Sequence, residues 1–246
     1  TDTIDGGDGT YELILDTSSA STTKTLSDFA NVSNVEELTL TSGGDDLDLT
    51  SGSNGFDTVT MGDGDDTLTI DANNVWIGKT LDGGANTDTL NLDGNVDLSN
   101  TEVLNFESIG ASGDLSLTVE QINDLTSINV GTNILRVVGN GADNSFSAAN
   151  ITASQITLTS GISQTTTVND LHMDLDASGS NQSIIINIGS TTSKNMQIKG
   201  SNGGADELNV ALANGEAITS GLSVDSAIES FNLTLTDNDH TLDLSN

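Results

Sequence analysis

Short stretches of alternating apolar and polar residues recur along the chain, and most lie next to a turn rich in glycine and aspartate. Alternation with a period of two is typical of β-strands that bury one face. The stretches that show it best are 36–40, 46–50, 102–106, 114–118, 183–188 and 240–244. The pattern predicts a chain built almost entirely of short strands.

Helical periodicity occurs in only two places. The segment 19–35 carries apolar residues at helical spacing, which predicts one or two helical turns. The segment 118–125 combines apolar residues three positions apart with Thr118 and Gln121, which resemble a capping box. We therefore expect a few short helical turns and no long helix.

A longer period is superimposed on the strands. One block of similar residues occurs four times, at 36–40, 102–106, 169–173 and 229–233, which gives a repeat of about 65 residues. Four diverged repeats are expected, at approximately 1–50, 51–118, 119–188 and 189–246. Such repeats are typical of a solenoid. The predicted fold is all-β: one continuous right-handed parallel β-solenoid or β-roll.

The stretch 43–69 can also be written as three nonapeptides, GGDDLDLTS, GSNGFDTVT and MGDGDDTLT. This alignment places Asp48, Asp57 and Asp66 in one column. Two further columns contain Asp46, Gly55 and Gly64, and Gly44, Ser53 and Gly62. A nine-residue period of this kind predicts a glycine-rich turn followed by a short strand whose apolar residue points inward.

The charge of the chain is extreme. Its 246 residues contain 37 Asp and Glu but only 5 Lys and Arg, for a formal net charge of -32. This charge argues against nucleic acid or an anionic membrane as a partner. Disorder is disfavoured because 34% of the residues are hydrophobic and regularly placed. Two explanations remain, bound cations or adaptation to high salt. The clustering of acidic residues in Gly-Asp turns favours bound cations.

Other functions are excluded or weakened by what the sequence lacks. There is no cysteine or proline, and no apolar run approaches the roughly 20 residues that span a bilayer. His172 and His240 are isolated, and no serine lies in a nucleophile motif, so no enzymatic activity is predicted. The first residues read as the end of a repeat, so we expect this chain to be a segment of a longer protein.

The third nonapeptide fits the pattern GGxGxDxUx, and in these nonapeptides the chain resembles the RTX family. The resemblance implies calcium ions held in the turns between strands by carboxylate and carbonyl oxygens. Asp48 and Asp66 are 18 residues apart and are expected to flank one ion; Asp57 would face the opposite, incomplete edge. The alternative is that these aspartates only cap turns. The predicted metal-binding residues are Asp8, Gly44, Asp46, Asp48, Asp57, Gly62, Gly64, Asp66, Asp88, Asp143 and Asp206.

Residues 83–106 extend the resemblance. They combine a Gly-Gly turn, the sequence Asp-Thr-Leu, a strand and the motif LSNTEVLNF, and they resemble repeats of bacterial surface-layer (S-layer) proteins with RTX-type calcium sites. That family implies type I secretion, calcium-triggered folding outside the cell and self-assembly, with cell-surface polysaccharide bound through a region outside this chain. The alternatives are a stalk or binding module of a large RTX-type adhesin, or the carrier segment of a secreted enzyme.

Overall fold

The computed structural model of the chain describes residues 3–17, 21–50, 55–73, 76–139, 145–159, 166–180, 182–188, 196–203, 205–212, 217–218, 222–235 and 241–242. Within these residues the chain forms a parallel β-solenoid, as the alternating pattern predicted: short strands of successive coils pair in parallel. The chain divides into two compact units, 1–115 with 124–129, and 116–123 with 130–246.

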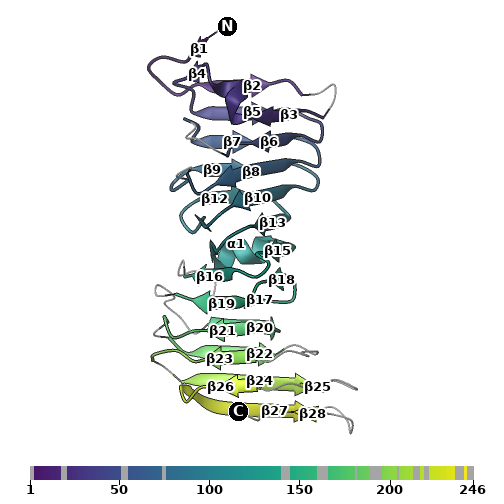
Figure 1. Ribbon diagram of the computed structural model, residues 1–246, viewed down its shortest axis with the longest axis vertical. Coiled ribbons are helices and arrows are strands. Elements are labelled where there is room, and N and C mark those ends of the chain that lie inside the picture. The colour runs from purple at the N-terminus through teal and green to yellow at the C-terminus, as the bar shows by residue number, and fades with distance from the viewer. Residues whose placement is uncertain are drawn as a thin grey trace. The chain divides into compact units, whose positions relative to one another are not determined.

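Unit 1 is built on two parallel sheets (Figure 1). The first contains, in chain order, β2 (Glu12–Leu15), β5 (Glu37–Leu40), β7 (Thr58–Thr60), β9 (Thr80–Asp82) and β12 (Glu102–Leu104). The second contains β3 (Thr23–Thr25), β6 (Asp46–Asp48), β8 (Thr67–Asp71), β10 (Thr89–Asp93), β13 (Ser108–Ala111) and β15 (Ser127–Asn129). Three two-residue strands lie outside these two sheets: β1 (Ile4–Asp5), its partner β4 (Val32–Ser33), and β11 (Val96–Asp97).

The core of unit 1 is a set of aliphatic columns that run from coil to coil. Leu47 pairs with Leu68, and Leu68 pairs with Leu90, so the three inward side chains lie on top of one another. All three are fully buried. The opposite sheet supplies Leu38 and Val59 in the same way. Since each strand is only a few residues long, one or two inward residues per strand are enough to fill the interior.

The coils are asymmetric. Glu36 precedes β5 and Asp45 precedes β6, nine residues apart, whereas the return from Asp45 to Asp57, just before β7, takes twelve. In the three coils that begin with β5, β7 and β9, only one half therefore has the nonapeptide length. The repeat of about 65 residues corresponds to three coils: Glu37 pairs with Thr58, Thr58 with Thr80, and Thr80 with Glu102.

The longer halves of the coils make room for larger residues. After β3, the chain forms the 3₁₀ helix η1 (Leu26–Phe29), the short helical segment predicted within 19–35. In the next coil, Phe56 occupies the corresponding corner, and the rings of Phe29 and Phe56 meet edge to face, with centroids 5.5 Å apart. Such pairs add about 1 kcal/mol to the burial of the rings.

Unit 2 repeats the two-sheet plan (Figure 1). One sheet contains β14 (Leu115–Thr118), β16 (Ile134–Val138), β19 (Gln155–Leu158), β21 (Asp174–Asp176), β23 (Met196–Lys199) and β26 (Leu222–Val224). The other contains β17 (Ser145–Ser147), β20 (Thr166–Leu171), β22 (Ile184–Ile188), β24 (Asp206–Leu212) and β27 (Ile228–Leu235). Two short strands pair with each other, β25 (Ala217–Ile218) and β28 (Thr241–Leu242), and β18 (Ile151–Thr152) completes the unit.

The predicted second helix is also present, as α1 (Val119–Asp124). Its capping box is formed as the sequence indicated. The Thr118 N–H donates to Gln121 Oε1 at 2.8 Å, and the Gln121 N–H donates to Thr118 Oγ1 at 3.2 Å. No helix in the described part of the chain is long and apolar enough to cross a membrane.

An asparagine ladder stabilises the outer face of the second sheet of unit 2. Asn187 Nδ2 donates to Asn169 Oδ1 at 2.7 Å, Asn209 Nδ2 donates to Asn187 Oδ1 at 3.1 Å, and Asn232 Nδ2 donates to Asn209 Oδ1 at 3.0 Å. The first three side chains thus each accept a hydrogen bond from the asparagine of the next coil. The ladder joins four strands by polar contacts, in addition to the apolar contacts of their buried face.

Candidate functional site

The Gly-Asp turns of three successive coils are stacked through their backbones. Asp63 forms parallel bridges to Ser42 on one side and Ala85 on the other. The Gly43 N–H donates to the Asp63 carbonyl at 2.7 Å, and the Gly64 N–H donates to the Ala85 carbonyl at 3.0 Å. The turns therefore hold each other in register by hydrogen bonds that run along the stack.

Close approach explains the glycines of these turns. Gly64 has φ +147°, and a Cβ at this position would collide with the carbonyl oxygen of Gly43. Gly62 has φ +95° and would meet the backbone of Leu40. Asn86, which the nonapeptide pattern places in a left-handed glycine position, has φ +93°. These positions need residues that tolerate positive φ.

Directly after the turns, four acidic residues form what we call the acidic column: Asp45, Asp66, Asp88 and Glu107. Asp45 N–H donates to Asp66 Oδ1 at 2.6 Å, and Asp66 N–H donates to Asp88 Oδ1 at 2.8 Å. Asp88 N–H donates to Glu107 Oε2 at 2.7 Å, and the Thr22 N–H donates to Asp45 Oδ1 at 2.8 Å. Each carboxylate thus binds the backbone of the preceding coil.

The other oxygen of three of these carboxylates has no partner. Asp45, Asp66 and Asp88 are at most 2% exposed, and the Oδ2 atom of each is buried without a hydrogen bond. Burial raises the pKa of Asp66, and it raises the pKa of Asp88 to about 6. The carboxylates stacked next to each group add to the increase. An unpaired buried oxygen is costly, so the acidic column is a place where a proton or a cation is stabilising.

The predicted pairing of Asp48 with Asp66 is wrong. In the sheet, Asp46 lies opposite Thr67 and Asp48 lies opposite Thr69, so the neighbour of Asp66 is Asp45. The prediction assumed two equal nonapeptides per coil, but the half between Asp45 and Asp57 is longer. The signal that finds the correct residue is the spacing to the buried leucine. Asp45, Asp66 and Asp88 each lie two positions before a buried leucine of the second sheet.

Asp46 and Asp48 lie outside the acidic column. Both project from the outer face of β6, where Asp46 is exposed and Asp48 is half-buried. Asp48 Oδ1 accepts a hydrogen bond from the Thr50 N–H at 2.8 Å. This contact is an ordinary aspartate turn, which was the alternative interpretation.

Asp57 lies on the other edge of the coil, as predicted, and its neighbours there are Glu36 and Lys79. Its N–H donates to the Glu36 carbonyl at 2.6 Å, and its own carbonyl accepts from the Thr80 N–H at 2.9 Å. Lys79 Nζ lies 3.4 Å from Asp57 Oδ1. The carboxylate of Asp57 thus already has a cationic partner.

The remaining predicted residues are dispersed. Asp8 is exposed, and its carbonyl accepts a hydrogen bond from the Tyr11 hydroxyl. Gly44 is packed under the Asp65 carbonyl, 3.0 Å from where a Cβ would lie. Asp206 is buried, but both of its oxygens are paired, with the Ile184 N–H and with Ser201. Asp143 lies outside the described residues.

In the part of the chain that the structure describes, no three His, Cys, Asp or Glu side chains form a group that could hold a metal ion by themselves. The acidic column nevertheless has the chemistry for a hard cation. The residues that carry its unpaired oxygens are neighbours through their backbones, Asp45 with Asp66 and Asp66 with Asp88. Calcium prefers carboxylate, carbonyl and water oxygens, so carboxylates from two coils could bind it together with backbone carbonyls and water.

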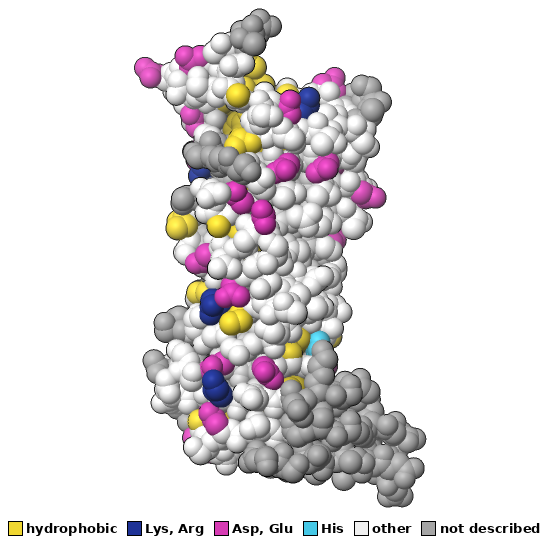
Figure 2. All heavy atoms as spheres, in the orientation of Figure 1, with side chains coloured by type: hydrophobic (Ala, Val, Ile, Leu, Met, Phe, Trp, Pro, Cys, Tyr) yellow, Lys and Arg dark blue, Asp and Glu magenta, His cyan; other side chains and the backbone are white. Residues whose placement is uncertain are grey.

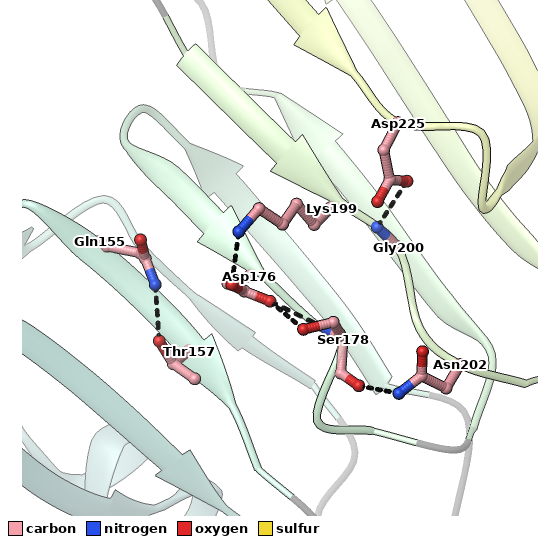
Figure 3. A network of polar contacts seen from close by, with 8 residues as sticks. All are labelled: Gln155, Thr157, Asp176, Ser178, Lys199, Gly200, Asn202 and Asp225. Carbon is pink, nitrogen blue, oxygen red and sulfur yellow. Dashed lines mark hydrogen bonds and ion pairs between the residues drawn. The ribbon is translucent and has the colours of Figure 1, made fainter.

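The polar contacts of unit 2 have a different character (Figure 3). Lys199 Nζ donates to Asp176 Oδ2 at 2.9 Å, and the Gly200 N–H donates to Asp225 Oδ1 at 3.0 Å. Asp176 also accepts hydrogen bonds from the N–H and the hydroxyl of Ser178. Asp176 and Asp225 thus each accept a hydrogen bond from another coil, and both oxygens of Asp176 are paired.

His172 also makes structural contacts. Its Nε2 lies 3.1 Å from the Ile151 carbonyl and its Nδ1 lies 3.0 Å from the Asp170 carbonyl. His240 lies outside the described residues.

Comparisons with known proteins found no matching protein family, no similar curated protein and no similar solved structure.

Proposed function

We propose that the chain is a structural protein of the bacterial cell surface that assembles with copies of itself in the presence of calcium. The assembly is an S-layer lattice or an extracellular filament, and the role is structural rather than enzymatic. Cell-surface polysaccharide would anchor it through a region outside this chain. The RTX and S-layer resemblance of residues 43–106 suggests this function, and the acidic column supports its calcium dependence.

The observation that carries the proposal is the buried oxygen that each of Asp45, Asp66 and Asp88 leaves unpaired. A protein with a net charge of -32 gains from any cation that neutralises buried carboxylates. Figure 2 shows acidic side chains spread over the face in view, with few basic ones to balance them. Calcium bound along the column would link successive coils and stiffen the solenoid.

Self-assembly also needs a surface on which two copies do not repel each other. The second sheet of unit 1 offers one. On β8, β10, β13 and β15, the central outward positions are uncharged and form the uncharged face: Thr67, Thr69, Thr89, Asn91, Ser108, Gly110, Ser127 and Asn129. Acidic side chains lie at its margin, with Asp93 at the end of β10 and Asp46 and Asp48 on β6. On the first sheet, the equivalent outward positions include Glu12, Glu37, Asp82 and Glu102. Like charges opposed across an interface are costly, so lateral contact is favoured on the uncharged face.

Light scattering and electron microscopy of the purified chain, with calcium and with chelator, test the proposal. We expect ordered sheets or filaments at millimolar calcium that dissolve on chelation, in the range typical of extracellular calcium modules. A chain that stays monodisperse at every calcium concentration would contradict assembly. Because the chain has no cysteine, Ser108→Cys provides a cross-linking test of the uncharged face, with Thr80→Cys on the acidic face as the matched control.

The second candidate is a stalk or binding module of a large RTX-type adhesin. The continuous leucine columns favour a stalk as much as they favour an assembling subunit, because a solenoid stiffened by calcium is a suitable spacer. The same experiment separates the two functions. A stalk would bind calcium and gain stability, but it would remain monomeric and Ser108→Cys would not cross-link.

A further inference from the structure

A cavity of about 590 Å³ lies at the corner of unit 1 where the coil that carries η1 meets the next coil. One wall comes from 25–35, which includes η1 and β4, and the other comes from Asp48, Thr50, Gly55 and Phe56. Figure 2 shows hydrophobic side chains gathered in a hollow of the surface near β4. The volume falls within the range of pockets that hold small organic molecules.

The described lining is mostly apolar. The edge-to-face pair of Phe29 and Phe56 forms part of it, together with Leu26, Val32 and Val35. Phe29, Phe56 and Val35 are each at most 8% exposed, so they are fixed by packing and offer a preformed surface. A ligand with an apolar or aromatic body could therefore bind without reorganising the wall.

The polar groups of the cavity favour one sign of charge. Asp48 is the only charged residue in the described lining, which contains no Lys, Arg or His. Its Oδ1 is held by the Thr50 N–H, which fixes the carboxylate at the wall and leaves Oδ2 as an acceptor. Uncharged hydrogen-bonding groups come from Thr25, Ser27 and Asn34. A carboxylate beside aromatic rings complements an ammonium group and repels an anion.

We propose that this cavity is a binding site for a small organic cation, an ammonium group on an apolar or aromatic body, with Asp48 as its counter-ion. The ammonium group would donate to Asp48, and the apolar body would pack against Phe29 and Phe56. The site is independent of the acidic column and of self-assembly. Asp48 does not lie beside Asp66. In this proposal its carboxylate instead binds the ligand of the cavity.

Phenethylammonium is the probe, titrated into the isotopically labelled chain and followed by NMR chemical shifts, with 3-phenylpropionate and benzyl alcohol as the anionic and neutral probes of similar shape. We expect shifts at 25–35 and Phe56, and the tightest binding for the ammonium compound. Asp48→Asn should weaken that binding about tenfold while leaving benzyl alcohol unaffected, since it removes a charge-assisted hydrogen bond.

Asp46→Asn is the matched control. Asp46 is on the same face of β6 as Asp48 and is exposed, but it does not line the cavity. It should leave phenethylammonium binding within a factor of about two, as expected for a screened surface charge. Circular dichroism of both variants verifies that the strands are retained. Equal binding of all three probes, equal effects of the two substitutions, or no shifts at the cavity would overturn the inference. The inference would also be overturned if calcium changed the NMR chemical shifts of the cavity residues and Asp48→Asn abolished those changes. That result would assign Asp48 to a metal site.

Discussion

Asp66 Oδ1 accepts a hydrogen bond from the Asp45 N–H at 2.6 Å, and this contact places the carboxylate of one coil against the backbone of the preceding one. Asp88 repeats the contact on Asp66 at 2.8 Å. The second oxygens remain buried and unpaired. One column of the solenoid therefore concentrates negative charge in the interior, where screening by solvent is weakest.

Asn substitution in the acidic column should separate the structural contact from the charge. Asp66→Asn keeps Oδ1 as the acceptor for the Asp45 N–H but removes the negative charge. We expect calcium to raise the melting temperature of the wild type and to raise that of Asp66→Asn by less than half as much. Differential scanning fluorimetry with calcium and with chelator measures this. Asp48→Asn is the matched control and should keep the full calcium increment; an equal loss in both variants would contradict the assignment.

The pH dependence of stability without calcium should follow the raised pKa of Asp88, which lies at about 6 in the folded chain. Between the ordinary aspartate pKa and this value, the folded state binds more protons than the unfolded state. Asp88 therefore adds stability as the pH falls through 6 and loses that contribution as the pH rises through 6. Denaturant unfolding of the wild type and of Asp88→Asn, measured in chelator across this pH range, isolates the contribution of Asp88 to the free energy of unfolding. A difference between the two proteins that does not change with pH would refute it.

With calcium present, the pH dependence should reverse. A bound cation requires ionised carboxylates, so the stabilisation by calcium should grow as the pH rises and disappear on acidification. The crossing of the two pH profiles, with calcium and with chelator, would be specific evidence that the cation and the proton compete for the same oxygens. Parallel profiles would place calcium elsewhere.

Gly64 should be among the least replaceable residues of the turns. Alanine there would clash with the Gly43 carbonyl as well as strain φ, so we expect Gly64→Ala to cost about 3 kcal/mol or more. Gly78 also has positive φ, +72°, but no atom lies within 4 Å of a Cβ placed there. Gly78→Ala should cost about 1 kcal/mol, the strain alone. Urea unfolding of both variants tests the comparison, and equal costs would mean that the turns are not closely stacked.

The asparagine ladder predicts coupling between coils of unit 2. Asn187→Ala removes two hydrogen bonds on a half-buried face and should cost about 1–3 kcal/mol. The exposed Gln197 on β23 is the control, and its replacement by alanine should cost less than about 0.5 kcal/mol. Because Asn187 and Asn209 share one bond, the double alanine variant should lose less than the two single losses together. Additive losses would show that the bond between Asn187 and Asn209 contributes nothing to stability.

The sequence was informative wherever a local rule determines the structure. Alternation identified inward residues such as Leu68 and Leu90, and the Thr118–Gln121 pair located α1. The left-handed turn at Asn86 was also predictable, because asparagine substitutes for glycine where φ is positive.

The register between coils was not predictable in the same way. Counting 18 residues back from Asp66 led to Asp48, because a nonapeptide pattern does not show that the two halves of a coil differ in length. The extra residues of the longer half include the packed Phe56 and, in the next coil, the buried Trp76. Only pairing between strands distant in sequence determines which aspartates meet. The cavity beside Asp48 could not be predicted either, since it depends on how two such corners pack.

Asp66 is hydrogen-bonded to the preceding coil through Asp45 and to the following coil through Asp88, so the same contact recurs once per coil. Removing 67–88 would join Asp66 directly to Thr89 and Leu90, which recreates the local sequence Asp-Thr-Leu found at Asp66 itself. Every remaining side chain would keep its column, its sheet and its inward or outward orientation. A molecule built in this way can be shortened or lengthened in whole-coil steps, whereas a change of a few residues would put a column out of phase.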